Sequence, residues 1–256
     1  MDPLQCAIAL AKEAGALLLD YRGRPLEERE KSGRGDLVTA ADRASERLVA
    51  ARLREAFPHS EVIGEEGTAH PGTSGERWIV DPLDGTTNFA HGYPLFCVSI
   101  AYERDGELEC GTVFAPVLDE LYTAERGGGA SCNGHRLEVS ETAVVARSLV
   151  CTGFVPARFE RNLPHFAHLS SKAQAVRRDG SAALDLAFVA AGRFDGFWEF
   201  DLSAWDVAAG ALLVREAGGT VTATDGGLFR LDGGAILATN GRIHAEMAQA
   251  LDEAGG

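Results

Sequence analysis

Residues 77–89 read Arg-Trp-Ile-Val-Asp-Pro-Leu-Asp-Gly-Thr-Thr-Asn-Phe. The apolar start of this run predicts a short buried strand that delivers Asp81 at its carboxyl end. Pro82 lacks a backbone donor and stiffens the bend that follows. Two residues after the bend begins, Asp84 can turn back towards the same point, with the carbonyl oxygen of Leu83 between the two carboxylates. Oxygen donors of this kind suit a hard cation such as Mg²⁺.

The second part of the run suits an anion. Gly85 allows close backbone approach, and residues 86–87 are expected to begin a helical turn with outward-facing N–H groups. One short loop can therefore hold a cation and a phosphate group beside it. A plain turn is the alternative, because Asp, Pro and Gly favour turns wherever they occur. The pair Asp105-Gly106 is expected to be only a turn, whereas the full run after a buried strand is much rarer by chance.

The overall composition excludes several classes of function. The 256 residues are 45% hydrophobic, which suits a globular chain with a sizeable core, and their formal net charge is −14. Such an acidic surface repels polyphosphate, and the basic residues do not cluster beyond the pair Arg177-Arg178, so we expect no nucleic-acid or membrane partner. The five cysteines are odd in number and widely spread, which argues against a disulfide framework and a structural zinc site. With no signal peptide and no membrane-length apolar run, the cytoplasm is the expected location.

The spacing of apolar residues predicts two closely joined halves. Residues 1–145 are expected to form an α+β half that contains an antiparallel sheet and the metal-binding loop, and residues 146–256 an α/β half. Helices are expected at 4–21, 40–57, 157–170, 181–191, 204–217 and 242–251. Strands of the first half are expected at 61–63, 78–80, 96–102, 108–115, 118–124 and 130–139.

Several segments together resemble the inositol monophosphatase family, within the lithium-sensitive, Mg²⁺-dependent phosphatase superfamily. The resemblance covers nearly the whole chain, and its elements follow one another in family-like order and separation. They are Asp36 to Asp42, Ile63 to Glu66, Asp81 to Phe89, and Trp205 to Gly210 followed by Glu216 to Gly219. The resemblance implies a mixed α+β and α/β fold, a layered αβαβα sandwich of the sugar-phosphatase type.

The resemblance also implies a set of metal ligands. Glu65, Asp81 and the carbonyl oxygen of Leu83 would hold a first Mg²⁺ ion. Asp81 would bridge to a second ion, which Asp84 and Asp206 complete, and Glu65 would share in a third, weaker site. The physics supports this set, since two like charges about 4 Å apart repel by about 4 kcal/mol at an effective dielectric of about 20. Four converging carboxylates therefore need cations.

Catalytic and substrate-binding roles follow from the same resemblance. The expected catalytic residues are Asp42, Thr86 and Glu65, of which Thr86 and Asp42 would hydrogen-bond to each other and help to deprotonate the attacking water. The backbone N–H groups of Gly85 and Thr86 would receive the phosphate. The expected substrate-binding residues are Gly85, Thr86, Gly180, Ser181, Ala182 and Glu199.

Four of these residues also have simpler structural interpretations. Asp42 can serve a capping box with Thr39, and Ser181 can be an ordinary helix N-cap. Asp206 falls in the first turn of its helix, where the helix dipole favours a carboxylate without any metal. Glu199 can be the one outward-facing charge of a strand.

The expected reaction is the hydrolysis of a small phosphate monoester, preferably myo-inositol 1-phosphate to inositol and phosphate, by a homodimer. Residues 201–204 depart from the family pattern beside the leaving-group pocket, which leaves the substrate less determined than the metal chemistry. Fructose-1,6-bisphosphatase and histidinol-phosphatase activities are the alternatives on the same scaffold. A regulatory or interaction protein that kept the fold and lost catalysis is the alternative of another class, although every expected ligand is present.

Overall fold

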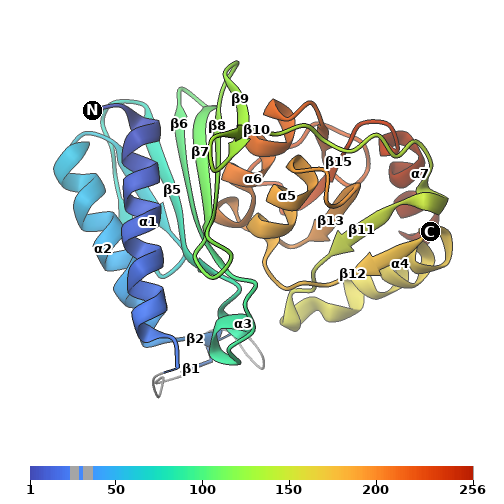
Figure 1. Cartoon of the computed structure of the whole chain (residues 1–256), viewed down its shortest axis with the longest axis horizontal. Helices are drawn as coiled ribbons and strands as arrows, with labels where there is room; N and C mark the ends of the chain where they lie inside the picture. The colour runs from blue at the N-terminus through green and yellow to red at the C-terminus, as the bar shows by residue number, and fades with distance from the viewer. Residues whose placement is uncertain (24–28, 31–36, 256) are drawn as a thin grey trace.

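Helices and sheets alternate in five layers across the molecule (Figure 1). The structure is a computed structural model that describes residues 1–23, 29–30 and 37–255. From left to right in Figure 1 the layers are α1 (Pro3–Tyr21) with α2 (Ala40–Ala56), an eight-stranded sheet, α5 (Ala182–Ala190) with α6 (Ala204–Glu216), a five-stranded sheet, and α4 (Phe159–Lys172) with α7 (His244–Gly255). The predicted αβαβα sandwich is confirmed.

The eight-stranded sheet has the order β10-β9-β8-β7-β6-β5-β3-β4. Its strands are β3 (Glu61–Gly64), β4 (Ala69–His70), β5 (Glu76–Asp84), β6 (Cys97–Arg104), β7 (Glu107–Ala115), β8 (Glu120–Glu125), β9 (Gly129–Cys132) and β10 (His135–Arg136). All its pairings are antiparallel except that of β3 with β5, so the expected antiparallel sheet is in fact mixed. The parallel pair is possible because the segment between the two strands is long enough to return to the starting end of the sheet.

Two strand boundaries differ from the prediction for local reasons. The strand expected at 130–139 is broken into β9 and β10, because Asn133 and Gly134 both have positive φ and form a tight hairpin turn. The strand expected from residue 118 begins at Glu120, since Asp119 has a φ of 52° and belongs to the preceding turn. Both departures come from turn residues inside otherwise strand-like sequence.

The five-stranded sheet has the order β12-β11-β13-β15-β14 and is also mixed. Its strands are β11 (Leu149–Thr152), β12 (Ala175–Arg177), β13 (Gly196–Phe200), β14 (Thr220–Thr222) and β15 (Ala235–Thr239). The short elements are β1 (Arg29–Glu30), β2 (Leu37–Val38), α3 (Thr86–Ala90) and two 3₁₀ turns, η1 (Val145–Arg147) and η2 (Pro156–Arg158). The expected division at 145/146 falls between the last strand of the first sheet and the first strand of the second, and the division into two closely joined halves stays a prediction. Asp36 of the first family-like segment lies outside the described residues.

The outer helix layer is held to the sheet by a buried aromatic group. Trp78 of β5 is fully buried, and its ring centroid lies 4.9 Å from that of Phe57 and 4.8 Å from that of Tyr102. Residue 57 follows the last turn of α2, so this contact fixes that helix against the strand that carries the polar loop. Tilted aromatic pairs of this kind add to the free energy of area burial.

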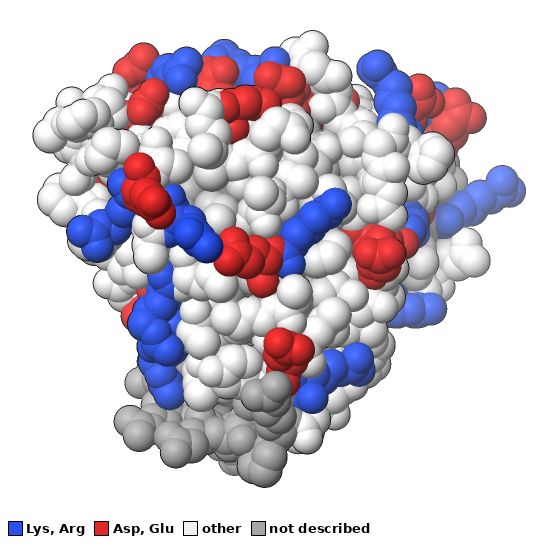
Figure 2. Space-filling view, turned by 60° about the vertical axis from the view of Figure 1, so that its left-hand side comes forward, with Lys and Arg blue, Asp and Glu red and all other residues white. Residues whose placement is uncertain are grey.

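The face that carries α1 and α2 comes forward in Figure 2. Acidic and basic side chains are mixed on this face, as in the ion pair of Arg52 with Glu13 at 3.5 Å. Exposed pairs of this kind contribute little to stability. Among the residues that the structure describes, no helix combines the length and the apolar character needed to cross a bilayer.

Helix α6 lies unusually close to both of its neighbours. A Cβ added to Gly210 would lie 2.5 Å from Cβ of Leu186 on α5, and one added to Gly111 of β7 would lie 2.9 Å from Cα of Ala209. Two glycines therefore set the depth of α6 between α5 and the sheet. Because Asp206 lies in the first turn of α6, the same contacts set the position of that carboxylate.

We predict that Gly210→Ala destabilises the protein by about 1–3 kcal/mol, the usual cost of inserting a methyl group into a well-packed core. Without the close contact to Leu186 the substitution would stabilise the protein, since alanine stabilises a helix interior by about 0.5–1 kcal/mol relative to glycine. Urea denaturation measures the free energy of unfolding. A variant as stable as the native protein, or more stable, would contradict the packing described here.

Candidate functional site

The carboxyl end of β5 holds two of the predicted ligands. Asp81 pairs with Ser99 of β6 and Asp84 pairs with Cys97, and the register shifts between these two pairs. The backbone N–H of Leu83 donates to Oδ1 of Asp81 at 3.0 Å and closes the turn. The strand therefore continues as a bulge past its predicted end, and the bulge is what brings both aspartates to one place.

Asp81 lies at the centre of a group of carboxylates. Its side chain is 1% exposed, and burial raises its pKa well above the ordinary value. The negative charges of Glu65, Asp84 and Asp206 raise this pKa further, and Glu65 is also its hydrogen-bond partner. The three other carboxylates expected to bind metal thus lie within electrostatic reach of Asp81.

Asp84 is held in place by the amino-terminal end of α5. Its Oδ2 accepts hydrogen bonds from Oγ of Ser181 and from the backbone N–H of Ala183, both at 2.7 Å. Burial raises the pKa of Asp84 to about 6, although these two hydrogen bonds lower it. Ser181 is the N-cap residue of α5, as its simpler interpretation predicts, but its hydroxyl donates to Asp84 instead of capping the helix.

Asp42 both caps α2 and contacts the polar loop, so its two expected roles coexist. Its Oδ2 accepts from the backbone N–H of Thr39 at 2.8 Å and from the Thr39 hydroxyl, which completes the capping box. Its Oδ1 accepts from Oγ1 of Thr86 at 2.8 Å. The carbonyl oxygen of Leu83 lies 3.1 Å from the same hydroxyl, which has a single proton and can serve one acceptor at a time.

Glu46, which the sequence analysis missed, fixes the turn that carries Glu65. It is 4% exposed, and its carboxylate accepts from the backbone N–H groups of Glu66 at 2.7 Å and Thr68 at 2.9 Å. A Cβ on Gly64 would lie 2.5 Å from the Glu46 carboxylate, so glycine is required there. A charged residue one helical turn after Asp42, on the buried face of α2, was the available signal.

Asp206 also combines a helix-capping role with a place in the carboxylate cluster. Its Oδ2 accepts from the backbone N–H of Ser203 at 2.6 Å and completes a capping box at the start of α6. Its charge raises the pKa values of Asp81 and Glu199, so it lies within electrostatic reach of both carboxylates. The helix-terminus interpretation is therefore right but incomplete.

Glu199 of β13 is buried, 6% exposed, so its interpretation as the outward-facing charge of a strand is wrong. Burial raises its pKa well above the ordinary value, and Asp206 raises it next. Gly153 makes room for this carboxylate, since a Cβ there would collide with it.

A cavity of about 220 Å³ joins these groups. It brings together every residue expected to bind substrate and three of the expected metal ligands, namely Gly85, Thr86, Gly180, Ser181, Ala182, Glu199, Glu65, Asp84 and Asp206. Asp81 and Leu83 are 1% exposed and lie beneath it, and Asp42 reaches it through Thr86. Leu202, from the segment that departs from the family pattern, also lines the cavity.

Two further residues at the cavity were missed by the sequence analysis as site residues. Asn88 donates through Nδ2 to the backbone oxygens of Leu95 at 2.6 Å and Asp179 at 2.7 Å, and so ties α3 to the loop before α5. Arg178 is the basic residue among the described residues that line the cavity, and its guanidinium lies 6.0 Å from the ring centroid of Phe154. Neither contact follows from local sequence, because each joins segments far apart in the chain.

Comparisons with known proteins agree with this geometry. A sequence model described as the inositol monophosphatase family matches residues 2–255. The chain is 49% identical to an inositol-1-monophosphatase of Rhizobium meliloti, over 86% of this chain and 83% of that protein. It is 46% identical to the Nus factor SuhB of Pseudomonas aeruginosa, over 94% of this chain and 92% of that protein. The solved structure of an inositol monophosphatase from Anabaena has a TM-score of 0.89 and 43% identity, and the match covers 98% of this chain and 95% of that one. The chain belongs to the inositol monophosphatase family.

Proposed function

We propose that this protein hydrolyses a small phosphate monoester, preferably myo-inositol 1-phosphate, with the help of Mg²⁺. The observation that carries the proposal is the convergence of four carboxylates on a cavity of about 220 Å³. A structural role does not explain this convergence, since buried like charges cost free energy unless a cation compensates them. The family supports a phosphoric monoester hydrolase.

The donor atoms at this place fit Mg²⁺. They are carboxylate and carbonyl oxygens, which hard divalent cations prefer. We assign Glu65, Asp81 and the Leu83 carbonyl to a first ion, Asp81, Asp84 and Asp206 to a second, and Glu65 to a share in a third, weaker one. When bound, such ions make water a better nucleophile and neutralise charge on the leaving oxygen.

Thr86 and Asp42 are assigned to the attacking water. When the Thr86 hydroxyl donates to Asp42, its oxygen keeps lone pairs that can accept a hydrogen bond from the water. The same choice frees the Leu83 carbonyl oxygen, 3.1 Å away, for a cation. The capping box holds the Asp42 carboxylate in place, so the water would be oriented by a group that is already fixed.

The other wall of the cavity is assigned to the substrate. The phosphate would meet the backbone N–H groups of Gly85 and Thr86, and Gly85 reaches this position with a φ of 93° that glycine adopts readily. Residues 180–182 and Glu199 would face the alcohol part. Arg178 would add a positive charge at the rim of the cavity, beside an otherwise acidic site.

The cellular location and the oligomeric state of the protein are further parts of the proposal. We infer a cytoplasmic protein and a homodimer, the first from cysteine usage and the second from the family resemblance. Cys6, Cys97, Cys110, Cys132 and Cys151 are all free thiols in the structure. Free, mostly buried thiols are typical of a reducing compartment.

We predict that Asp84→Asn lowers kcat/KM by about 10³-fold or more, because one ligand supplies several kcal/mol of charge stabilisation in the transition state. The amide oxygen can still accept from Ser181 and Ala183, so the fold is kept. With EDTA, the variant should melt at a higher temperature than the native protein at pH 7, since one like charge is removed. Asp105→Asn, in an exposed hairpin turn, is the matched control. Full activity of Asp84→Asn would refute the two-ion assignment.

Glu46→Gln should weaken the response to Mg²⁺ more than the chemistry itself. Glutamine presents one oxygen and one N–H₂ group to two N–H donors, so one hydrogen bond is lost and the turn that carries Glu65 is loosened. We expect the Mg²⁺ concentration for half-maximal activity to rise by about 10–100-fold, with kcat largely restored at saturating Mg²⁺. Glu55→Gln, an exposed change on the same helix, is the control. An unchanged Mg²⁺ response would show that Glu46 does not position Glu65.

A substrate panel separates the proposed reaction from its alternatives. We expect the highest kcat/KM with myo-inositol 1-phosphate, compared with fructose 1,6-bisphosphate, histidinol phosphate and adenosine 3′,5′-bisphosphate, and inhibition by Li⁺ through competition at the second metal position. Comparable rates on several compounds would indicate a broad-range phosphatase. No activity on any of them, from protein that binds Mg²⁺, would favour a regulatory role, which the Nus factor name of the Pseudomonas relative makes the second candidate.

A further inference from the structure

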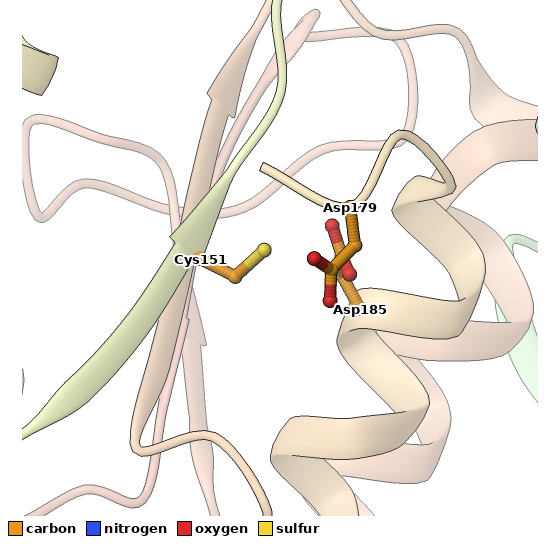
Figure 3. Close-up of side chains that lie close together, drawn as sticks. All are labelled: Cys151, Asp179 and Asp185. Carbon is orange, nitrogen blue, oxygen red and sulfur yellow. The ribbon is translucent and has the colours of Figure 1, made fainter. Parts of the chain in front are cut away.

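Cys151, Asp179 and Asp185 form a second group of potential metal ligands, outside the carboxylate cluster around Asp81. Each offers one ligand atom, and the three atoms lie within 4.8 Å of one another. Figure 3 shows the three side chains directed towards a common point between β11 and the first turn of α5. They come from a strand, a loop and a helix that the fold brings together.

The carboxylate of Asp185 provides an independent sign of a ligand. The residue is 1% exposed, and its Oδ1 has no hydrogen-bond partner of ordinary geometry within the described part of the chain. The thiol of Cys151, itself a member of the group, is the side chain that hydrogen-bonds to this carboxyl group. Such buried acceptors are rare in folded proteins, and a bound ion or water is a common explanation. The side chain is directed towards the other two members of the group, so the oxygen faces the place where an ion would lie.

The surroundings leave a negative charge at these three groups without compensation unless a cation is bound. Burial raises the pKa of all three groups, which disfavours their charged forms when no cation is bound. The charge of Asp185 and its hydrogen bond with Cys151 raise the pKa of this thiol further, whereas a hydrogen bond from the backbone N–H of Asp179 lowers it. Asp185 lies in the first turn of α5, where the helix dipole favours a carboxylate. A divalent cation would replace the protons as the compensating charge.

We propose that Cys151, Asp179 and Asp185 bind a divalent transition-metal ion of the Zn²⁺ type. One thiolate and two carboxylates favour such an ion over Mg²⁺, which prefers oxygen donors alone. Three protein ligands leave a fourth position for water. The cysteine pattern argued against zinc because it has no closely spaced pair, but these ligands lie far apart in sequence and meet only in the fold.

This ion would brace one wall of the cavity. Asp179 is followed directly by Gly180 and Ser181, and the latter holds Asp84. An ion that links Asp179 to Cys151 on β11 and Asp185 on α5 would restrict movement of this loop. The site stands apart from the proposed phosphatase reaction, since none of its three ligands is assigned to that chemistry.

The test is a Co²⁺ titration of the chelator-treated full chain, with Mg²⁺ in excess to fill the carboxylate cluster. We expect a near-ultraviolet charge-transfer band from thiolate to Co²⁺ that saturates at an equimolar ratio and disappears when Zn²⁺ is added. Cys151→Ala should remove the band, and Cys132→Ala, at a half-buried cysteine elsewhere, should leave it unchanged. Asp179→Asn changes a half-buried side chain and should weaken Co²⁺ binding more than about tenfold.

The readout is optical and does not depend on phosphatase activity, so the two proposals can fail separately. A folded native protein without the band, or a band that persists in Cys151→Ala, would overturn the metal site. If Cys151→Ala does not fold, Asp179→Asn decides, and native Co²⁺ affinity in that variant would contradict the proposal.

Discussion

The repulsion among the buried carboxylates at the end of β5 is the constraint on which the rest of the site depends. Asp81 is almost fully buried with three other carboxylates in electrostatic reach, an arrangement that costs free energy without compensating cations. The surrounding structure holds these groups in place. The amino-terminal end of α5 donates two hydrogen bonds to Asp84, α2 contributes Asp42 and Glu46, and the first turn of α6 contributes Asp206.

The layered fold explains why one short loop can collect groups from so many segments. Strand β5 lies in the eight-stranded sheet between α2 on one face and α5 and α6 on the other (Figure 1). The amino-terminal ends of these helices, from two layers, therefore lie beside the carboxyl end of β5. The bulge after Asp81 brings Asp81 and Asp84 together at the carboxyl end of β5. Close packing at Gly210 then fixes how far α6 reaches into the site.

Much of the fold and of the candidate site could be predicted from the sequence, because the decisive signals are local. The run from Trp78 to Phe89 combines strand, bend and helix start, and the capping box of α2 is explicit in Thr39 and Asp42. The missed features depend on long-range contacts. Glu46 and Asn88 form hydrogen bonds with backbone groups of segments far from them in sequence. The burial of Glu199 depends on how β13 packs in the folded protein.

The pH dependence of stability tests the central claim most directly. Without metal, the pKa of Asp84 is raised in the folded state from 3.8 to about 6. The free energy of unfolding should therefore be highest below the pKa that Asp84 has in the unfolded chain, and should fall as the pH rises through about 6. Saturating Mg²⁺ should remove this loss and stabilise the protein most at neutral pH, where the carboxylates are charged. The free energy of unfolding, measured by urea denaturation from pH 4 to 8 with Mg²⁺ or with EDTA, gives both curves. Two parallel curves would contradict the claim that the clustered carboxylates are built to hold cations.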